Sequence, residues 1–133
     1  MNPQPITLGS EAEVIQIVSQ DDLASILGEE DDIFPKVFAT SKMVALMEIA
    51  ASRLLKKYLQ YGKCSVGIEI NVNHVSPASL GAKVKAIAKL IKIESNRYIF
   101  FIQAFNDNRL IGEGFHKRAI VDIDIIEKTA KKK

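Results

Sequence analysis

Glu48 is the residue whose surroundings most strongly suggest chemistry. All residues from Met43 to Ala51 except Glu48 are apolar. A carboxylate among apolar neighbours is costly unless it is paired, hydrogen-bonded or neutralised. We therefore interpret Glu48 as a functional carboxylate. The alternative is a structural carboxylate held by a buried backbone group or by a lysine.

His74 and Thr40 are two further candidates. His74 ends the apolar face of an alternating stretch, where a histidine either transfers protons near neutral pH or is a hydrogen-bonded core residue. Thr40 precedes the longest helical pattern, and the structural role expected of it, or of Ser41, is that of an N-cap. The start of a helix also carries free N–H groups and a positive dipole end, which suit an oxyanion.

The last predicted strand carries a fourth candidate cluster on one face, formed by Gly112, Gly114, His116 and Arg118. Two glycines on one face allow close approach to the backbone, by a ligand or by a packed helix. Arg118 either holds a phosphate or carboxylate or forms an internal ion pair. No metal-ligand spacing, glycine-rich phosphate loop or nucleophile-elbow sequence is present. These residue types favour acid–base or hydrolytic chemistry.

One long helix must position several of these residues. Apolar residues with helical spacing predict a buried helix over 37–61, ended by Gly62. A shorter helix is expected over 19–28, with Asp21 or Asp22 as its cap.

Period-two patterns and turn residues predict five strands, at 11–19, 64–74, 82–94, 98–105 and 110–124. The second strand has one apolar face, made by Val66, Ile68, Ile70, Val72 and His74. Tight turns between the last strands favour a meander. The predicted fold class is α+β, a hot-dog fold in which an antiparallel sheet wraps around one long buried helix.

The composition is that of one ordinary globular domain. The 133 residues are 47% hydrophobic and 26% charged, with a net charge of +2, and we expect a single domain over 1–133 with loose termini at 1–9 and 126–133. The small charge argues against nucleic-acid binding, and the absence of a long apolar segment argues against a membrane span, so a cytoplasmic protein is expected. Cys64 is the single cysteine, and the uncovered faces of a small sheet predict a homodimer.

Four motifs, taken in order, resemble one known family. They are FPKVFAT at 34–40, MVALME at 43–48, GIEINVNH at 67–74 and GEGFHKR at 112–118. Their order and spacing are similar to those of the fluoroacetyl-CoA thioesterases of the hot-dog superfamily, and the similarity covers residues 10–125.

The resemblance implies a thioester hydrolase that acts on acyl-CoA as a homodimer, with CoA as part of the substrate and no separate cofactor or metal. The catalytic residues that it implies are Thr40, Glu48 and His74. The substrate-binding residues that it implies are Phe34 as a lid over the acyl pocket, Gly67 near the thioester carbonyl and Arg118 near the acyl end. A tryptophan expected beside the glutamate is replaced by Ile49, which favours a general short-chain acyl-CoA over fluoroacetyl-CoA.

The spacing of two candidates adds a geometric expectation. Thr40 and Glu48 are eight positions apart, which is about 12 Å along one straight helix. The site is therefore expected at or near the dimer interface, unless Thr40 lies on a loop folded back over the helix. The alternative function is a non-catalytic acyl-CoA-binding protein of the same fold, and a hot-dog hydratase ranks below both.

Overall fold

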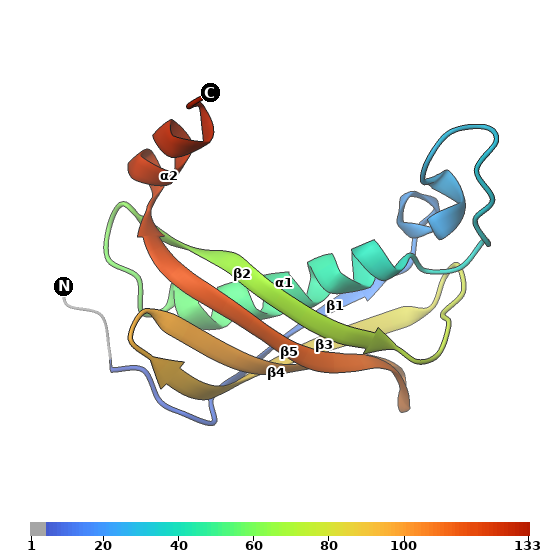
Figure 1. Ribbon diagram of the computed structural model, residues 1–133. Coiled ribbons are helices and arrows are strands. Elements are labelled where there is room, and N and C mark those ends of the chain that lie inside the picture. The colour runs from blue at the N-terminus through green and yellow to red at the C-terminus, as the bar shows by residue number, and fades with distance from the viewer. Residues whose placement is uncertain (1–4) are drawn as a thin grey trace.

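The computed structural model describes residues 5–133 as a five-stranded antiparallel sheet that curves around one long helix, α1 (Figure 1). The helix α1 runs from Thr40 to Lys56. The strands are β1 (Glu11–Ile17), β2 (Lys63–His74), β3 (Lys83–Glu94), β4 (Arg97–Asn106) and β5 (Arg109–Asp122). The predicted α+β class and the number of strands are confirmed.

The strand order is β1-β3-β4-β5-β2, with every neighbouring pair antiparallel. The consecutive strands β3, β4 and β5 form the expected meander. The strand β2 pairs with β5 alone, so its other edge lies free at one side of the sheet. That edge carries unpaired backbone groups, which is a template for pairing with another chain.

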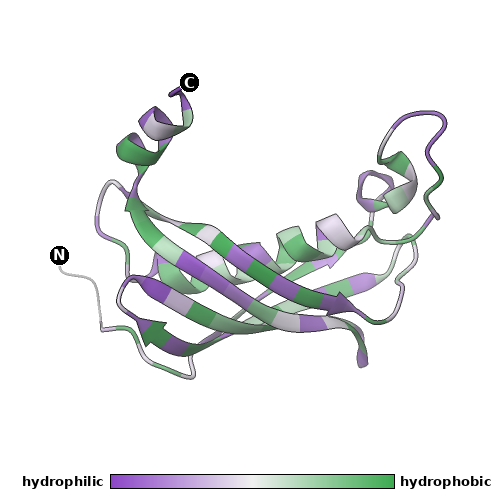
Figure 2. Cartoon of the chain, viewed as in Figure 1, coloured by the Kyte–Doolittle hydropathy of each residue, from purple (hydrophilic) through white to green (hydrophobic). Residues whose placement is uncertain are grey.

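Alternation along β3 explains how the sheet covers the helix. Val84, Ala86, Ala88 and Leu90 are fully buried, and the residues between them are at least partly accessible. The same alternation of apolar and polar residues is visible along the strands in Figure 2. Each fully buried large apolar side chain contributes about 1.5–3 kcal/mol relative to exposure.

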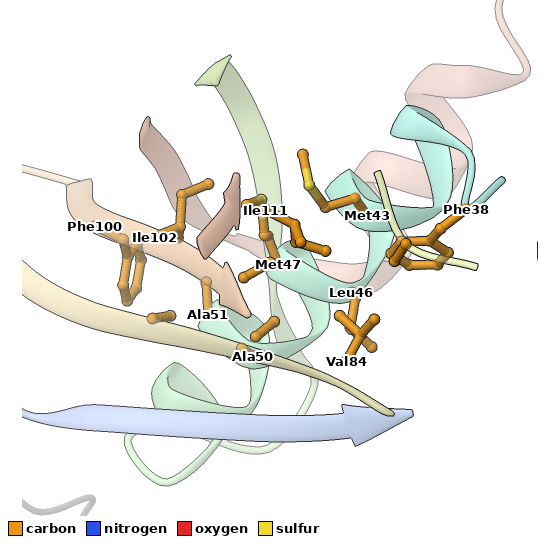
Figure 3. Close-up of a cluster of buried hydrophobic side chains, with 14 of the residues drawn as sticks. Phe38, Met43, Leu46, Met47, Ala50, Ala51, Val84, Phe100, Ile102 and Ile111 are labelled. Carbon is orange, nitrogen blue, oxygen red and sulfur yellow. The ribbon is translucent and has the colours of Figure 1, made fainter. Parts of the chain in front are cut away.

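The core lies between the sheet and one face of α1 (Figure 3). Met43, Met47 and Leu54 of the helix are at most 1% exposed. Phe100 and Ile102 of β4 and Ile111 of β5 complete this layer. The helix is thereby held by its inner face along its whole length.

The prediction that α1 is buried on all sides is wrong. Ala45 is exposed, Val44 and Glu48 are half-buried, and Ile49 is 41% exposed. These residues lie on the side of the helix that the sheet does not cover. The helix is also shorter than the predicted 37–61, and Gly62 (φ +82°) lies in the turn before β2 rather than at the helix end.

The predicted single apolar face of β2 is also wrong, because a β-bulge interrupts it. Gly67 is opposite Arg118 and Glu69 is opposite Lys117, so Ile68 has no partner in β5. An extra residue shifts the period-two alternation by one position. Val66 therefore lies on the opposite face from Val72 and His74, and Gly67 takes the inward position.

Two predicted details at the ends of the chain also differ. The short helix consists of two 3-10 turns, Gln20–Asp22 and Ala24–Ile26, and Ser19 rather than either aspartate is the N-cap. Residues 123–130 form a second helix, α2 (Ile123–Ala130), rather than a frayed end, and α2 projects from the body of the domain (Figure 1). No helix within residues 5–133 is long and apolar enough to cross a membrane.

Close packing accounts for both glycines of β5. A Cβ built on Gly112 would lie 2.5 Å from Sδ of Met43, which is buried in the core. A Cβ built on Gly114 would meet the carbonyl oxygen of Asn71 and lie 2.7 Å from Cα of Val72. Those two atoms belong to the backbone of β2, which has no rotamer to change.

Gly114→Ala is therefore expected to lower the free energy of unfolding by about 1–3 kcal/mol, as overpacking does. Urea unfolding at a fixed protein concentration measures the change. The control is Lys89→Ala at an exposed position of β3, expected to stay within about 0.5 kcal/mol of wild type. Wild-type stability in Gly114→Ala would contradict the close approach of β2 and β5.

Candidate functional site

Thr40 and His74 meet at the N-terminal end of α1. Ala39 is the N-cap, so the expected capping role of Thr40 is wrong, and Thr40 is instead the first residue of the helix. Its Oγ1 lies 2.7 Å from Nδ1 of His74, the last residue of β2. A hydroxyl either donates to a ring nitrogen or accepts from it, so the pair is able to pass a proton.

The imidazole of His74 has one nitrogen without a partner. Its Nε2 is buried and has no hydrogen-bond partner within the described chain. Burial lowers the pKa of His74 below its ordinary value of 6.5, and a hydrogen bond with the backbone of Ser76 opposes that effect. An unpaired buried polar group costs about 1–3 kcal/mol, so Nε2 lacks the partner that a buried ring nitrogen usually has.

The Thr40–His74 pair lies on the wall of an open cavity of about 470 Å³. Most of the lining side chains are apolar: Ala24, Leu27, Phe34, Pro35, Val37, Phe38, Val75 and Pro77. Phe34 lies in the segment between the 3-10 turns and α1 and is 43% exposed. An apolar cavity with a few polar groups at one wall is typical of a small-molecule site.

Glu48 belongs to a second group of residues, further along α1. The position that a Cβ on Gly67 would take is 3.2 Å from Oε1 of Glu48, 3.1 Å from Cε1 of His116 and 3.6 Å from Nη1 of Arg118. Glu48, Gly67 and His116 line a smaller cavity of about 250 Å³, together with Ile68, Glu69 and Ile70. A side chain at position 67 would fill that cavity.

Arg118 is held by hydrogen bonds at its buried position. Its Nε lies 2.9 Å from Oγ of Ser65, its Nη2 lies 2.8 Å from the Ser65 carbonyl oxygen, and its Nη1 lies 3.1 Å from Nε2 of His116. Burial lowers the pKa of Arg118 below its ordinary value, and the nearby Glu48 carboxylate opposes the shift. The guanidinium stays charged at neutral pH and lies close enough to the Glu48 carboxylate to interact with it electrostatically.

The six predicted site residues thus form two groups within one chain. Phe34, Thr40 and His74 line the larger cavity. Glu48 and Gly67 line the smaller one, and Nη1 of Arg118 lies 3.6 Å from the position that a Cβ on Gly67 would take. The part of the site that sequence reasoning missed is the contact between His116 and Arg118. Their separation by two residues on one strand indicates a shared face, but not that the two side chains make contact.

The arrangement of the sheet around α1 defines the fold class of this protein. An antiparallel sheet wrapped around one long helix is the hot-dog fold, as predicted. Solved structures share it across nearly the whole chain. The fluoroacetyl-CoA thioesterase FlK superposes with a TM-score of 0.91 at 29% identity, covering 96% of this chain and 97% of that one. A Thermus thermophilus thioesterase superfamily member superposes with a TM-score of 0.87 at 28% identity, covering 96% and 93%.

Sequence comparisons identify the family. The model of a family described as fluoroacetyl-CoA-specific thioesterase matches residues 18–124. A curated fluoroacetyl-CoA thioesterase from Streptantibioticus cattleyicolor is 37% identical over 91 residues, which span 68% of this chain and 66% of that protein, just under two thirds of its length. The chain belongs to the fluoroacetyl-CoA-specific thioesterase family.

The two histidines give the stability of the fold a predictable pH dependence. Burial lowers the pKa of His116 below 6.5, Arg118 lowers it further, and the Glu69 carbonyl and Glu48 oppose the shift. Just below pH 6.5 the two histidines therefore bind more protons in the unfolded chain than in the folded one. The stability that the neutral histidines contribute is complete above that pH, and it is lost as the pH falls toward their lower pKa values in the folded protein. We expect the free energy of unfolding to fall as the pH drops below about 6.5.

Denaturant unfolding at several pH values measures this slope, and His116→Gln serves as the comparison. The variant is expected to show a smaller slope because it lacks one of the two titrating rings. Asp22 does not interfere, since its pKa is lowered from 3.8 and its contribution is lost only at more acidic pH. Identical slopes for the two proteins would contradict the assignment to His116.

Proposed function

We propose that this protein is an acyl-CoA thioesterase that hydrolyses a short-chain acyl-CoA to the free acid and CoA. The observation that carries the proposal is the Thr40–His74 pair at the wall of an apolar cavity, in a chain of this family. The family's namesake acts on fluoroacetyl-CoA, and a structure of a variant of FlK holds fluoroacetate and CoA. CoA enters as part of the substrate, with no separate cofactor.

The residue types suit each step of the reaction. Hydrolysis adds the oxygen of water to the thioester carbonyl carbon, breaks the C–S bond, and gives the leaving thiolate a proton. Free N–H groups in the first turn of α1, beside Thr40, suit the oxyanion that forms at the carbonyl oxygen. His74, neutral at pH 7, accepts and returns a proton through the Thr40 hydroxyl. Glu48 serves as the base or the nucleophile.

Thr40 and Glu48 cannot reach one bound carbonyl within a single chain, because they lie about 12 Å apart along α1. A second copy of the chain solves this problem if its Glu48 approaches the Thr40 end of the first. The proposed site is therefore shared between two subunits.

The surface beside Glu48 supports a homodimer. The free edge of β2 carries Ile68 and Ile70, which are 44% and 39% exposed, and Ile49 of α1 is 41% exposed. These side chains adjoin the uncovered strip of α1, formed by Val44, Ala45, Glu48 and Ile49. A second copy would pair the strand edge and bury this apolar strip at once. A cytoplasmic location stays a prediction from the sequence.

Glu48→Gln is expected to lower kcat at least about 100-fold, because an amide neither accepts the water proton nor attacks the carbonyl. Release of CoA from acyl-CoAs of increasing chain length measures this, with Cys64→Ser as a control for reaction of Cys64 with the thiol reagent. Thermal unfolding and size-exclusion chromatography check that the variant stays folded and dimeric. Wild-type turnover in Glu48→Gln would overturn the assignment. Binding of acyl-CoA without turnover by the wild-type protein would support the non-catalytic alternative.

Mixing inactive variants tests the shared site directly. Thr40→Ala and Glu48→Gln, each inactive alone, are unfolded together and refolded as a mixture. Half of the dimers are then mixed and each has one intact site, so about a quarter of wild-type turnover is expected. No recovery in a mixture that contains mixed dimers would overturn the shared site, because Thr40 of one subunit would then not work with Glu48 of the other.

Phe34→Ala is expected to change the preference for acyl chain length more than it changes stability. Phe34 lines the larger cavity and is 43% exposed, so truncation enlarges the cavity and removes little from the core. The ratio of kcat/KM for a medium-chain and a short-chain acyl-CoA should rise about tenfold, the value of one or two added methylenes. Phe38→Ala, at a fully buried neighbour, is the contrasting variant, expected to cost about 3–5 kcal/mol of stability. A large stability loss in Phe34→Ala with unchanged selectivity would make Phe34 a core residue.

A further inference from the structure

His116 is a buried polar side chain to which the proposed reaction assigns no role. It is 1% exposed, on the inner face of β5, and Arg118 beside it is 6% exposed. Its Nδ1 lies 2.8 Å from the carbonyl oxygen of Glu69, and its Nε2 lies 3.1 Å from Nη1 of Arg118. The Phe100 ring packs near it, at a centroid distance of 6.3 Å.

These two contacts fix the protonation state of the ring. A backbone carbonyl only accepts, so Nδ1 must carry a hydrogen. A guanidinium only donates, so Nε2 must present a lone pair to Arg118. The neutral imidazole with its proton on Nδ1 is the one form that satisfies both partners.

The ring in turn fixes the guanidinium of Arg118. Ser65 holds Nε and Nη2, and His116 holds Nη1. Because all three of its nitrogens have hydrogen-bond partners, the guanidinium plane is held in one orientation. Its Nη1 lies next to the small cavity, 3.6 Å from the position that a Cβ on Gly67 would take. Oε1 of Glu48 lies 3.2 Å from the same point.

We propose that His116 is a positioning residue: through its unprotonated Nε2 it orients the guanidinium of Arg118, so that an Nη1 hydrogen is presented to the acyl end of the substrate beside Gly67 and Glu48. The inference rests on the proposed function, because it needs the shared site, in which the small cavity of one subunit meets the Phe34-lined cavity of the other and the acyl group lies where the two join. It assigns His116 no contact with the reacting atoms. Its effect is to select acyl groups that fit the fixed Nη1 hydrogen.

Two substitutions of His116 separate this role from simple core packing. The amide of His116→Asn reaches the Glu69 carbonyl but is too short to accept from Arg118. The longer His116→Gln places an amide oxygen where Nε2 lay and restores an acceptor for Nη1. Both shrink the side chain and remove the ring, so both should lower thermal stability to a similar extent.

We expect kcat/KM for the best acyl-CoA substrate to fall up to about 100-fold in His116→Asn, the size of effect that a small misplacement produces. His116→Gln should recover most of this loss. The inhibition constant of free CoA, which has no acyl end, should be unchanged in both. Equal losses in the two variants would reduce His116 to a packing residue.

A double-mutant cycle with Arg118→Ala shows whether His116 acts through Arg118. His116→Asn should have no further effect on kcat/KM in the Arg118→Ala background, since there is then no guanidinium to orient. Independent, multiplicative losses would overturn the proposal. If the wild-type protein binds acyl-CoA without turnover, the same cycle is measured on the Kd ratio of acyl-CoA to free CoA, with the same two outcomes.

The tautomer itself is measured without reference to activity. The ¹⁵N chemical shifts of the His116 ring at neutral pH should show a protonated Nδ1 and an unprotonated Nε2. A proton on Nε2, or a charged ring, would overturn the proposal whatever the protein hydrolyses. If the wild-type protein shows the expected tautomer but neither binds nor hydrolyses acyl-CoA, the proposed function and the substrate part of this inference are both wrong. The contact between His116 and Arg118 is then still supported.

Discussion

The packing of α1 against small side chains of the sheet is the contact on which the rest of the molecule depends. Ala50 and Ala51 of the helix face a sheet whose central strands present Ala86, Ala88 and Ala104, and all five are fully buried. Such short side chains let a helix approach a sheet closely. The larger residues Phe38 and Leu54 then fill the two ends of the layer. Because one rigid helix carries both Thr40 and Glu48, this packing fixes the positions of both.

A second constraint is that polar groups inside the sheet must find partners. The inner face of β5 carries a histidine and an arginine where a strand of this kind usually carries apolar residues. Their hydrogen bonds run to β2, through Ser65 and the Glu69 carbonyl. The pairing of β2 with β5 therefore does more than extend the sheet. It brings the acceptors that offset the cost of burying Arg118, and Nη1 of Arg118 stays close to Gly67.

The sequence predicts the parts of this structure that have a regular period. In β3, alternation from Val84 to Leu90 is uninterrupted, so the inward residues follow directly. In β2, the sequence does not reveal the bulge at Ile68, because the apolar residues at 66, 68, 70 and 72 fit an uninterrupted alternation equally well. The apolar run around Glu48 indicates a helix, but it cannot show which side the sheet leaves open. The link between His116 and Arg118 depends on ring geometry, which spacing along a strand does not specify.

Because of the bulge at Ile68, the number of residues in β2 also determines which of its side chains face the site. Before the bulge, Ser65 and Gly67 point inward at odd-numbered positions, and after it Ile70, Val72 and His74 point inward at even-numbered positions. A one-residue deletion there would leave a regular strand of acceptable composition, yet it would turn either the Gly67 end or the His74 end toward the outer face. A related sequence that keeps every candidate residue but lacks this extra position would therefore have lost one of its two cavities, and residue identity alone would not reveal the loss.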